Sequence, residues 1–231
     1  MWTRKRAKKS KRYEQCKKLY DGEKSYSLRE GVELLKNFPK AKFNESVEVV
    51  MKLSIDPKRS DQMLRGSISL PKGIGKELRV VVFAKGEKAE EARKAGAVET
   101  GVEELVKKVE AGWMDFDVAI ATPDMMRQIG KLGRVLGPQG KMPSPKSGTV
   151  TDNIGEAVKE FKAGKIEYRN DAGGNVHALI GKLSFSTEDL VANIESFINH
   201  VLASRPASAK GTFVQKTIIS STMSPGIKVG V

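Results

Sequence analysis

The stretch SVEVVMKLSIDPKRSDQMLRGSISLPKGIGKELRVVVFA, residues 46–84, contains two kinds of strand pattern. Its first part, residues 46–55, alternates between apolar and polar side chains, which is typical of a strand buried on one face. Its last part, residues 78–84, is a mostly apolar run, which is typical of a strand buried on both faces. The change of pattern near Gly73 predicts that two different sheets share this part of the chain.

The segments on either side of residues 74–164 predict one mixed domain. Ser27 and Glu30 form a capping-box pattern, which indicates a helix over residues 28–37. Further strands and one long helix are expected at residues 66–70, 165–169, 176–185, 187–202 (the helix) and 211–222. Residues 165–169 and 176–185 should pair as a hairpin across the turn cluster 170–175. These elements predict an α+β domain of split β-α-β type, with two helices on an antiparallel-rich sheet of four or five strands.

The middle of the chain has a different pattern. Strands and helices alternate there, at residues 78–84, 87–95, around Val98, 103–111, 116–121 and 151–163. This order indicates a small, Rossmann-like parallel sheet in three layers, with helices on its faces. Residues 130–148 are rich in glycine, proline and basic side chains without an acid, so we expect a long basic loop.

The outer segments carry most of the positive charge. The chain has 41 basic and 28 acidic residues, a net charge of +13. Residues 1–73 contribute +10, residues 74–164 only +1, and residues 165–231 another +2. Such a surplus points to a polyanionic partner, with nucleic acid the first candidate and an anionic membrane surface the second. The basic run 4–12 is expected to be disordered or weakly helical until it meets an anion; the alternative is a solubilising tail.

Composition argues against several classes of protein. Cys16 is the single cysteine, so a disulfide within the chain and a multi-cysteine zinc site are excluded. The two histidines, His177 and His200, are distant in sequence, and we expect neither a metal nor a cofactor. No apolar run is long enough for a membrane span, and no apolar segment follows the basic N-terminal residues. We therefore expect a cytoplasmic protein that is not associated with a membrane.

Enzymatic and nucleotide-binding patterns are weak. The histidines fit ordinary surface or half-buried positions, and no nucleophile has an evident base nearby. A phosphate-binding loop requires a hydroxyl residue after its glycine and lysine, but Gly140-Lys141 is followed by Met142. An RNA site requires cations for phosphates, apolar faces for bases, and hydroxyl groups. The uncharged tract 220–224 supplies hydroxyls and one apolar side chain, although it also fits an ordinary strand end.

Several long runs in the same order carry a resemblance to a known family. They include KFNESVEV (42–49), IDPKRSDQ (55–62), GWMDFD (112–117), MPSPK (142–146) and KGTF (210–213). Over essentially the whole chain after the basic tail, the sequence resembles the bacterial branch of the ribosomal protein L1 family. The resemblance implies a discontinuous domain, residues 1–73 and 165–231, with a second domain, residues 74–164, inserted in it. Gly73 and Gly164 would be its hinge; the alternative is that both glycines merely end secondary structure.

The resemblance also implies a function. The protein would be a monomer when free, and it would bind large-subunit ribosomal RNA at the mobile stalk without catalysis, cofactor or metal. It would assist release of deacylated tRNA from the exit site and repress translation of its own messenger RNA. Two alternatives stay open: a protein that chiefly represses messenger RNA, and a nucleotide-binding enzyme that uses the inserted domain. The family usually has glycine where this chain has Ser224. The RNA-binding residues implied by position are Lys42, Phe43, Glu48, Lys52, Arg59, Arg169, Asp171, Thr222, Met223 and Ser224.

Overall fold

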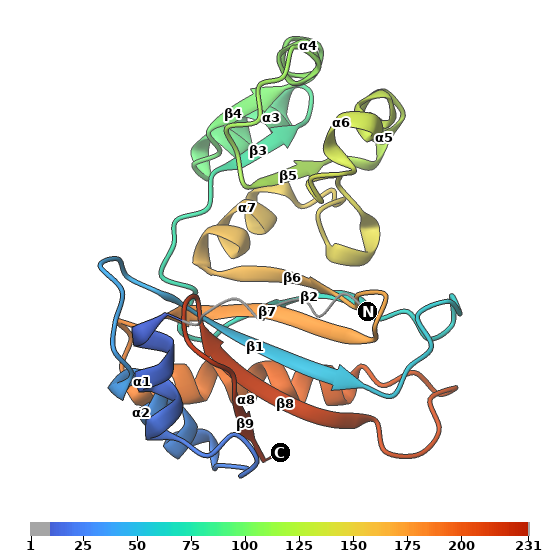
Figure 1. Ribbon diagram of the computed structural model, residues 1–231. Coiled ribbons are helices and arrows are strands. Elements are labelled where there is room, and N and C mark those ends of the chain that lie inside the picture. The colour runs from blue at the N-terminus through green and yellow to red at the C-terminus, as the bar shows by residue number, and fades with distance from the viewer. Residues whose placement is uncertain (1–9, 231) are drawn as a thin grey trace, which may run out of the picture. The chain divides into compact units, whose positions relative to one another are not determined.

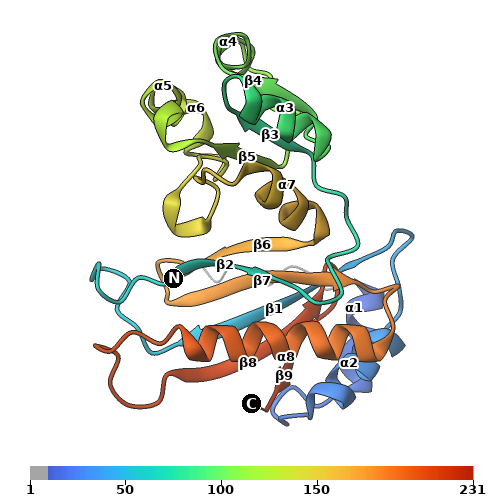
Figure 2. The same ribbon diagram turned by 180° about the vertical axis from the view of Figure 1, so that it is seen from behind.

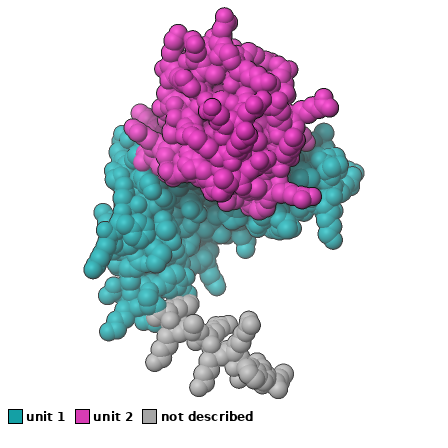
Figure 3. Space-filling view, turned by 90° about the horizontal axis from the view of Figure 1, so that it is seen from above, with its two compact units in different colours: residues 1–63, 170–231 teal, residues 64–169 magenta. Residues whose placement is uncertain are grey.

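The computed structural model of the protein describes residues 10–230 (Figures 1 and 2). The chain divides into two compact units (Figure 3). Unit 1 combines Met1–Met63 with Asn170–Val231, and unit 2 is Leu64–Arg169. The expected crossings at Gly73 and Gly164 both lie within unit 2. The reason is that strands β2 (Arg65–Ser69) and β6 (Lys165–Arg169) pair with each other and contact helix α7 (Ile154–Ala163) of that unit.

Unit 1 is built on a four-stranded antiparallel sheet in the order β7-β1-β8-β9. Both β7 and β8 run antiparallel to β1, which lies between them. The alternation predicted for β1 is confirmed, because alternate side chains from Val47 to Leu53 are buried. Strand β9 was not predicted. The strands are β1 (Ser46–Leu53), β7 (Asn175–Lys182), β8 (Val214–Ser221) and β9 (Ile227–Val229).

Helices α2 (Leu28–Asn37) and α8 (Thr187–Ala203) cover one face of this sheet. The predicted capping box of α2 forms, since the Ser27 hydroxyl accepts from the Glu30 N–H and the Glu30 carboxylate accepts from the Ser27 N–H. Helix α1 (Lys11–Leu19) was not predicted; its one buried residue is Cys16, so it has no apolar stripe. Lys11 and Arg12 of the basic run belong to α1, and residues 4–9 lie outside the described residues.

The hairpin predicted between residues 165–169 and 176–185 does not form. Strand β7 pairs with β1, whereas β6 pairs with β2. Within the described chain, a single bridge between Asn170 and Val176 spans the turn that was expected to close the hairpin. Proximity in sequence favoured the hairpin, but β1 offers β7 a longer edge whose buried row continues that of β7.

Unit 2 contains a three-stranded parallel sheet with helices on both faces. Its order is β4-β3-β5, with β3 (Val80–Phe83), β4 (Glu99–Gly101) and β5 (Val118–Ala121). Strand β3 sends alternate side chains into two separate cores, and all four are fully buried. This explains the uninterrupted apolar run in the sequence. One core contains residues of α3 (Glu87–Lys94) and α7 (Ile154–Ala163), and the other contains residues of α4 (Glu103–Glu110), α5 (Met126–Ile129) and α6 (Gly133–Leu136).

The segment 130–148 is more ordered than the predicted long basic loop. It contains α6 and the short turns η2 (Gly130–Leu132) and η3 (Pro145–Ser147), while η1 (Pro123–Met125) precedes it. Its Lys141 turns inward, where Nζ donates to the carbonyl oxygens of Met114 and Phe116 at 3.0 and 2.6 Å. Nζ also lies 4.9 Å from the centre of the Phe116 ring. This charge is therefore used inside unit 2 and is less available to a partner.

Gly73 and Gly164 lie against each other within unit 2. Their φ angles are +64° and +115°, in the region that favours glycine. A Cβ on Gly164 would lie 2.5 Å from the Cα of Gly73, closer than any side chain tolerates. Glycine is thus required here by backbone conformation and by close approach of two segments. Gly164 also ends α7 in a left-handed conformation.

Candidate nucleic-acid interface

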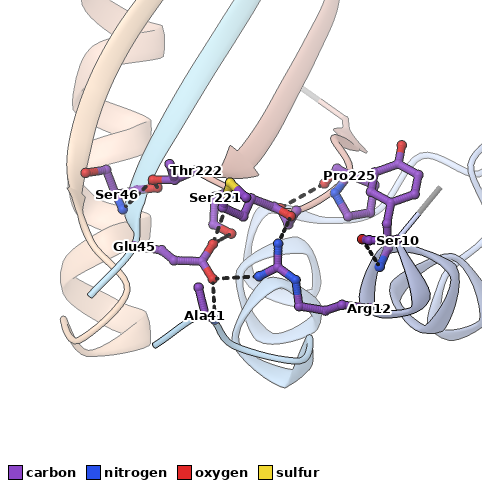
Figure 4. Close-up of polar contacts among 11 residues, drawn as sticks. Ser10, Arg12, Ala41, Glu45, Ser46, Ser221, Thr222 and Pro225 are labelled. Carbon is purple, nitrogen blue, oxygen red and sulfur yellow. Dashed lines mark hydrogen bonds and ion pairs between the residues drawn. The ribbon is translucent and has the colours of Figure 1, made fainter. Parts of the chain in front are cut away.

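The carboxylate of Glu45 joins the segment before β1 to the loop after β8 (Figure 4). Glu45 is only 2% exposed, and it accepts hydrogen bonds from the Ala41 N–H at 2.8 Å, the Ser221 hydroxyl at 2.5 Å and the Met223 N–H at 3.1 Å. Burial acts to raise the pKa of Glu45, but these donors and the nearby Arg12 outweigh burial, so the pKa is lowered. Glu45 is therefore a buried, ionised group that fixes two segments to each other.

Arg12 of α1 makes a second tie to the same loop. Its Nη2 donates to the carbonyl oxygen of Met223 at 3.0 Å, and its Nη1 lies 3.5 Å from Oε1 of Glu45. Met223 is consequently held through both of its backbone polar groups, the N–H by Glu45 and the carbonyl by Arg12. The planar guanidinium suits this task because its N–H groups can reach two acceptors in fixed directions.

The side chain of Ser224 forms hydrogen bonds within the loop after β8. Its hydroxyl oxygen accepts from the Ser221 N–H at 2.9 Å, and the hydroxyl donates to the carbonyl oxygen of Pro225 at 3.0 Å. No non-glycine residue in the described chain has a positive φ, so Ser224 adopts an ordinary backbone conformation. Ser224 therefore contributes hydrogen bonds to this loop without backbone strain.

Two large apolar side chains are exposed beside this network. Phe43 is 52% exposed and Met223 is 51% exposed, although the backbone around each is tied down through Glu45 and its partners. Thr222 is tied to the start of β1, because Ser46 N–H donates to its hydroxyl at 2.9 Å and its own N–H donates to the Ser46 carbonyl at 3.0 Å. Lys42 is also exposed and is the neighbour of Phe43 in the sequence. The surface therefore presents two apolar side chains, on which unpaired RNA bases can stack, and a cation, which can contact a phosphate.

Glu48 and Lys52 lie on the face of the sheet opposite to the buried row of β1. In the register of the sheet, Glu48 pairs with Ser220 and Lys52 pairs with Lys216, both on β8. From Ser46 to Lys52 the strand spans about 20 Å. Glu48 is therefore near the Glu45 network, whereas Lys52 is at the far end of β1.

At that far end, Asp171 organises a turn rather than projecting as an isolated charge. Its Oδ1 accepts from the backbone N–H groups of Gly173 and Asn175 at 2.8 and 2.7 Å, and its Oδ2 accepts from the Asn175 side-chain amide at 2.9 Å. The bonds from Asn175, followed by that from Gly173, lower the pKa of Asp171 to about 2. Lys52 Nζ donates to the Gly173 carbonyl, so Lys52 and Asp171 meet in this turn.

The other two predicted residues are Arg59 and Arg169, which make none of the hydrogen bonds described above. Arg59 follows β1 in an exposed turn, where its guanidinium lies 3.3 Å from the carboxylate of Asp61. Arg169 ends β6 in unit 2, directly opposite Arg65 of β2. The structure thus brings Lys42, Phe43, Thr222, Met223 and Ser224 into one neighbourhood around Glu45, and Lys52 and Asp171 into another.

Glu45 and Arg12 were not predicted as residues of the site, whereas Ser221 belongs to the hydroxyl-bearing tract 220–224 that was predicted. One local signal could have found Glu45: it precedes β1 in phase with the buried row that includes Val47. A carboxylate in a buried phase must find donors, so its position predicts a polar network. Arg12 carried no comparable signal, because it stands within a run of similar basic residues.

The described residues offer no arrangement that would suit a reactive thiol, a metal site or a membrane span. Cys16 is buried, and burial raises the pKa of its thiol, which keeps it unreactive. Among residues 10–230, no group of three or more His, Cys, Asp or Glu side chains is arranged to hold a metal ion. Every helix in this part of the chain is too short or too polar to cross a membrane.

Comparisons with known proteins agree on one family. The family model described as "Ribosomal protein L1p/L10e family" matches residues 35–225. The chain is 54% identical to the large ribosomal subunit protein uL1 of Kosmotoga olearia, with 96% of each chain covered. It is 52% identical to the protein of that name from Lactiplantibacillus plantarum, covering 96% of this chain and 97% of the relative. It is 56% identical to that from Fervidobacterium nodosum, covering 96% of this chain and 95% of the relative.

Proposed function

Because the chain belongs to the ribosomal protein L1p/L10e family, we propose that it is a component of the large ribosomal subunit and binds ribosomal RNA at the mobile stalk. The family consists of structural ribosomal proteins, so the chain is not an enzyme and the nucleotide-dependent alternative is excluded. The stalk as the RNA target follows from the family resemblance. Unit 1 is the RNA-binding part in this proposal.

One observation supports this assignment above the others: Phe43 and Met223 are exposed, while a buried ionic network holds the loop that carries Met223. Other large apolar side chains of the described residues, such as Met63, are exposed as well, but Phe43 and Met223 differ in that both belong to segments tied to the one buried carboxylate of Glu45. An RNA with unstacked bases gains stacking partners from them. Unit 1 also has 22 basic and 13 acidic residues against 19 and 15 in unit 2, so phosphates are drawn to unit 1.

The proposal is tested with unit 1 alone. The chain leaves unit 1 at Met63 and returns at Asn170, and these positions are near each other because Arg65 and Arg169 are paired neighbours. A short glycine linker between Met63 and Asn170 removes unit 2. We expect this protein to keep most of its affinity for stalk RNA. A folded unit 1 that binds at least a hundredfold more weakly than the full chain would contradict the assignment.

We also propose that the same surface represses the protein's own messenger RNA. The residues around Glu45 come from short segments of unit 1 and form a small surface. A messenger RNA with the same local fold as the stalk RNA could therefore bind to that surface in the same way. Competition between stalk RNA and the messenger leader tests this. We expect mutual displacement, and simultaneous binding of both RNAs would show that separate surfaces are used.

A last part of the proposal concerns motion and tRNA. In this proposal residues 1–73 and 165–231 are the discontinuous domain and residues 74–164 are the inserted domain, so that β2 and β6 belong to the outer part of the chain. Gly73 and Gly164, which lie between these two strands and the rest of unit 2, would then serve as hinge residues during release of tRNA from the exit site. The two chain crossings support some freedom between the units, since a two-strand connection can bend. Single-molecule energy transfer between labels on the two units should give a broad or two-state distance distribution. A single narrow distribution that RNA leaves unchanged would overturn the hinge.

A further inference from the structure

Glu45 poses a physical problem at the proposed RNA surface. A buried carboxylate is costly unless donors satisfy it, and a negative charge beside a polyanion weakens binding. Glu45 nevertheless has three hydrogen-bond donors and an adjacent guanidinium, so it is ionised in the folded protein. All four partners lie on segments that carry or hold exposed residues of the site. The position of Glu45 thus suits a role in geometry and not in direct contact with RNA.

Arg12 completes that geometry from a distant part of the chain. It approaches Met223 and Glu45 together, and its side chain is only 26% exposed. Its charge faces a buried carboxylate at 3.5 Å. A cation in this position is poorly placed to meet an RNA phosphate. Arg12 therefore differs in kind from the other basic residues of the N-terminal run.

We propose that Arg12 and Glu45 are positioning residues for RNA recognition, which hold the Met223 peptide groups so that the side chain faces the RNA. This inference rests on the proposed function for its RNA readout. The proposal divides the basic N-terminal run into two parts. Arg12 contributes to specificity for the cognate RNA, whereas the basic residues before Ser10 attract any RNA through their charge. Removal of Arg12 should then weaken binding to cognate RNA and leave the salt dependence unchanged.

A matched pair of substitutions tests this on the full-length protein. Arg12→Met and Lys18→Met each remove one cation from α1, but Lys18 is exposed and lies outside the network. Dissociation constants are measured for stalk RNA and for a random duplex at several salt concentrations. We expect Arg12→Met to weaken stalk RNA about tenfold and the random duplex less than about threefold. Lys18→Met should affect both RNAs alike. An equal loss on both RNAs with Arg12→Met, together with a shallower salt slope, would identify Arg12 as a phosphate contact and overturn the proposal.

Glu45→Gln keeps the shape of the side chain and tests the other half of the pair. Because Arg12 and Glu45 act on one loop, the double variant should bind stalk RNA about as weakly as the weaker single variant. Arg12→Lys should not restore binding, since one ammonium group cannot reproduce the two-acceptor geometry. Full additivity of the two substitutions would show that the residues act independently and would overturn the proposal.

A measurement without RNA separates this inference from the proposed function. The Met223 amide is bonded to Glu45, so its hydrogen exchange should be slow in the wild-type protein. We expect exchange of this amide to be about tenfold faster in Arg12→Met, while amides in the middle of β1 keep wild-type rates. Unchanged exchange at Met223 would overturn the positioning role whatever the RNA data show. Failure of the wild type to prefer stalk RNA would instead count against the proposed function.

Discussion

Truncation of Met223 to alanine should weaken binding of cognate RNA and leave the fold intact. The side chain is already 51% exposed, so its removal should change the free energy of unfolding by less than about 0.5 kcal/mol. Complete burial of a methionine side chain is worth about 1.5–3 kcal/mol, so covering its exposed half with a base is worth about 0.8–1.5 kcal/mol. This predicts a dissociation constant for stalk RNA that rises roughly four- to twelvefold.

The assay is filter binding of stalk RNA and of a random duplex of equal length at one fixed salt concentration, with thermal unfolding measured in parallel. Leu202→Ala is the control, because Leu202 is 40% exposed but lies on α8, outside the segments that the Glu45 network joins. The control should bind both RNAs like the wild type. The reasoning is refuted if Met223→Ala retains wild-type affinity for stalk RNA, or if both RNAs lose affinity equally.

Three further predictions concern stability. Gly164→Ala should lower the free energy of unfolding by about 2 kcal/mol or more, because the new Cβ would clash with Gly73 and because residue 164 has a positive φ. Gly155→Ala in α7 is the control and should be neutral or slightly stabilising, since a Cβ there meets nothing. Urea denaturation measures both variants. Ser224→Gly should cost about 1 kcal/mol by the same assay, since two hydrogen bonds of the loop are lost; equal stability would contradict that role. The depressed pKa of Asp171 means that its ionised form stabilises the fold above about pH 4, and this contribution is lost as the pH falls toward 2. Asp171→Asn should therefore flatten the fall in stability across that window, and curves that stay parallel to the wild type would contradict it.

Local patterns were sufficient for elements whose stabilising interactions lie within a few residues. The capping box of Ser27 and Glu30 predicted the start of α2, and the alternation of β1 predicted which of its side chains are buried. The apolar run containing β3 predicted a strand covered on both faces. These features could be predicted because helix capping and the periods of 3.6 and 2 residues are properties of neighbouring positions.

Strand partners were decided by the tertiary structure. Sequence proximity suggested that β6 and β7 form a hairpin, yet β7 pairs with β1 and β6 with β2. The backbone groups of a strand can bond to any edge of suitable length, so local sequence does not select the partner. Burial of the row of apolar side chains selects it, and that row is completed only when distant segments meet.

For the candidate site, the sequence by itself determined that the chain is basic, that residues 220–224 offer hydroxyls and an apolar side chain, and that family runs include Phe43 and Met223. Only the tertiary structure decided how Met223 is held. Its backbone is fixed by Glu45 and Arg12, and Glu45 is 33 positions from Arg12 and 176 positions from Ser221, its other partner. Hydrogen bonds between such distant positions leave no periodicity in the sequence: the phase of Glu45 with the buried row of β1 predicts that its carboxylate needs donors, but it does not say which residues supply them.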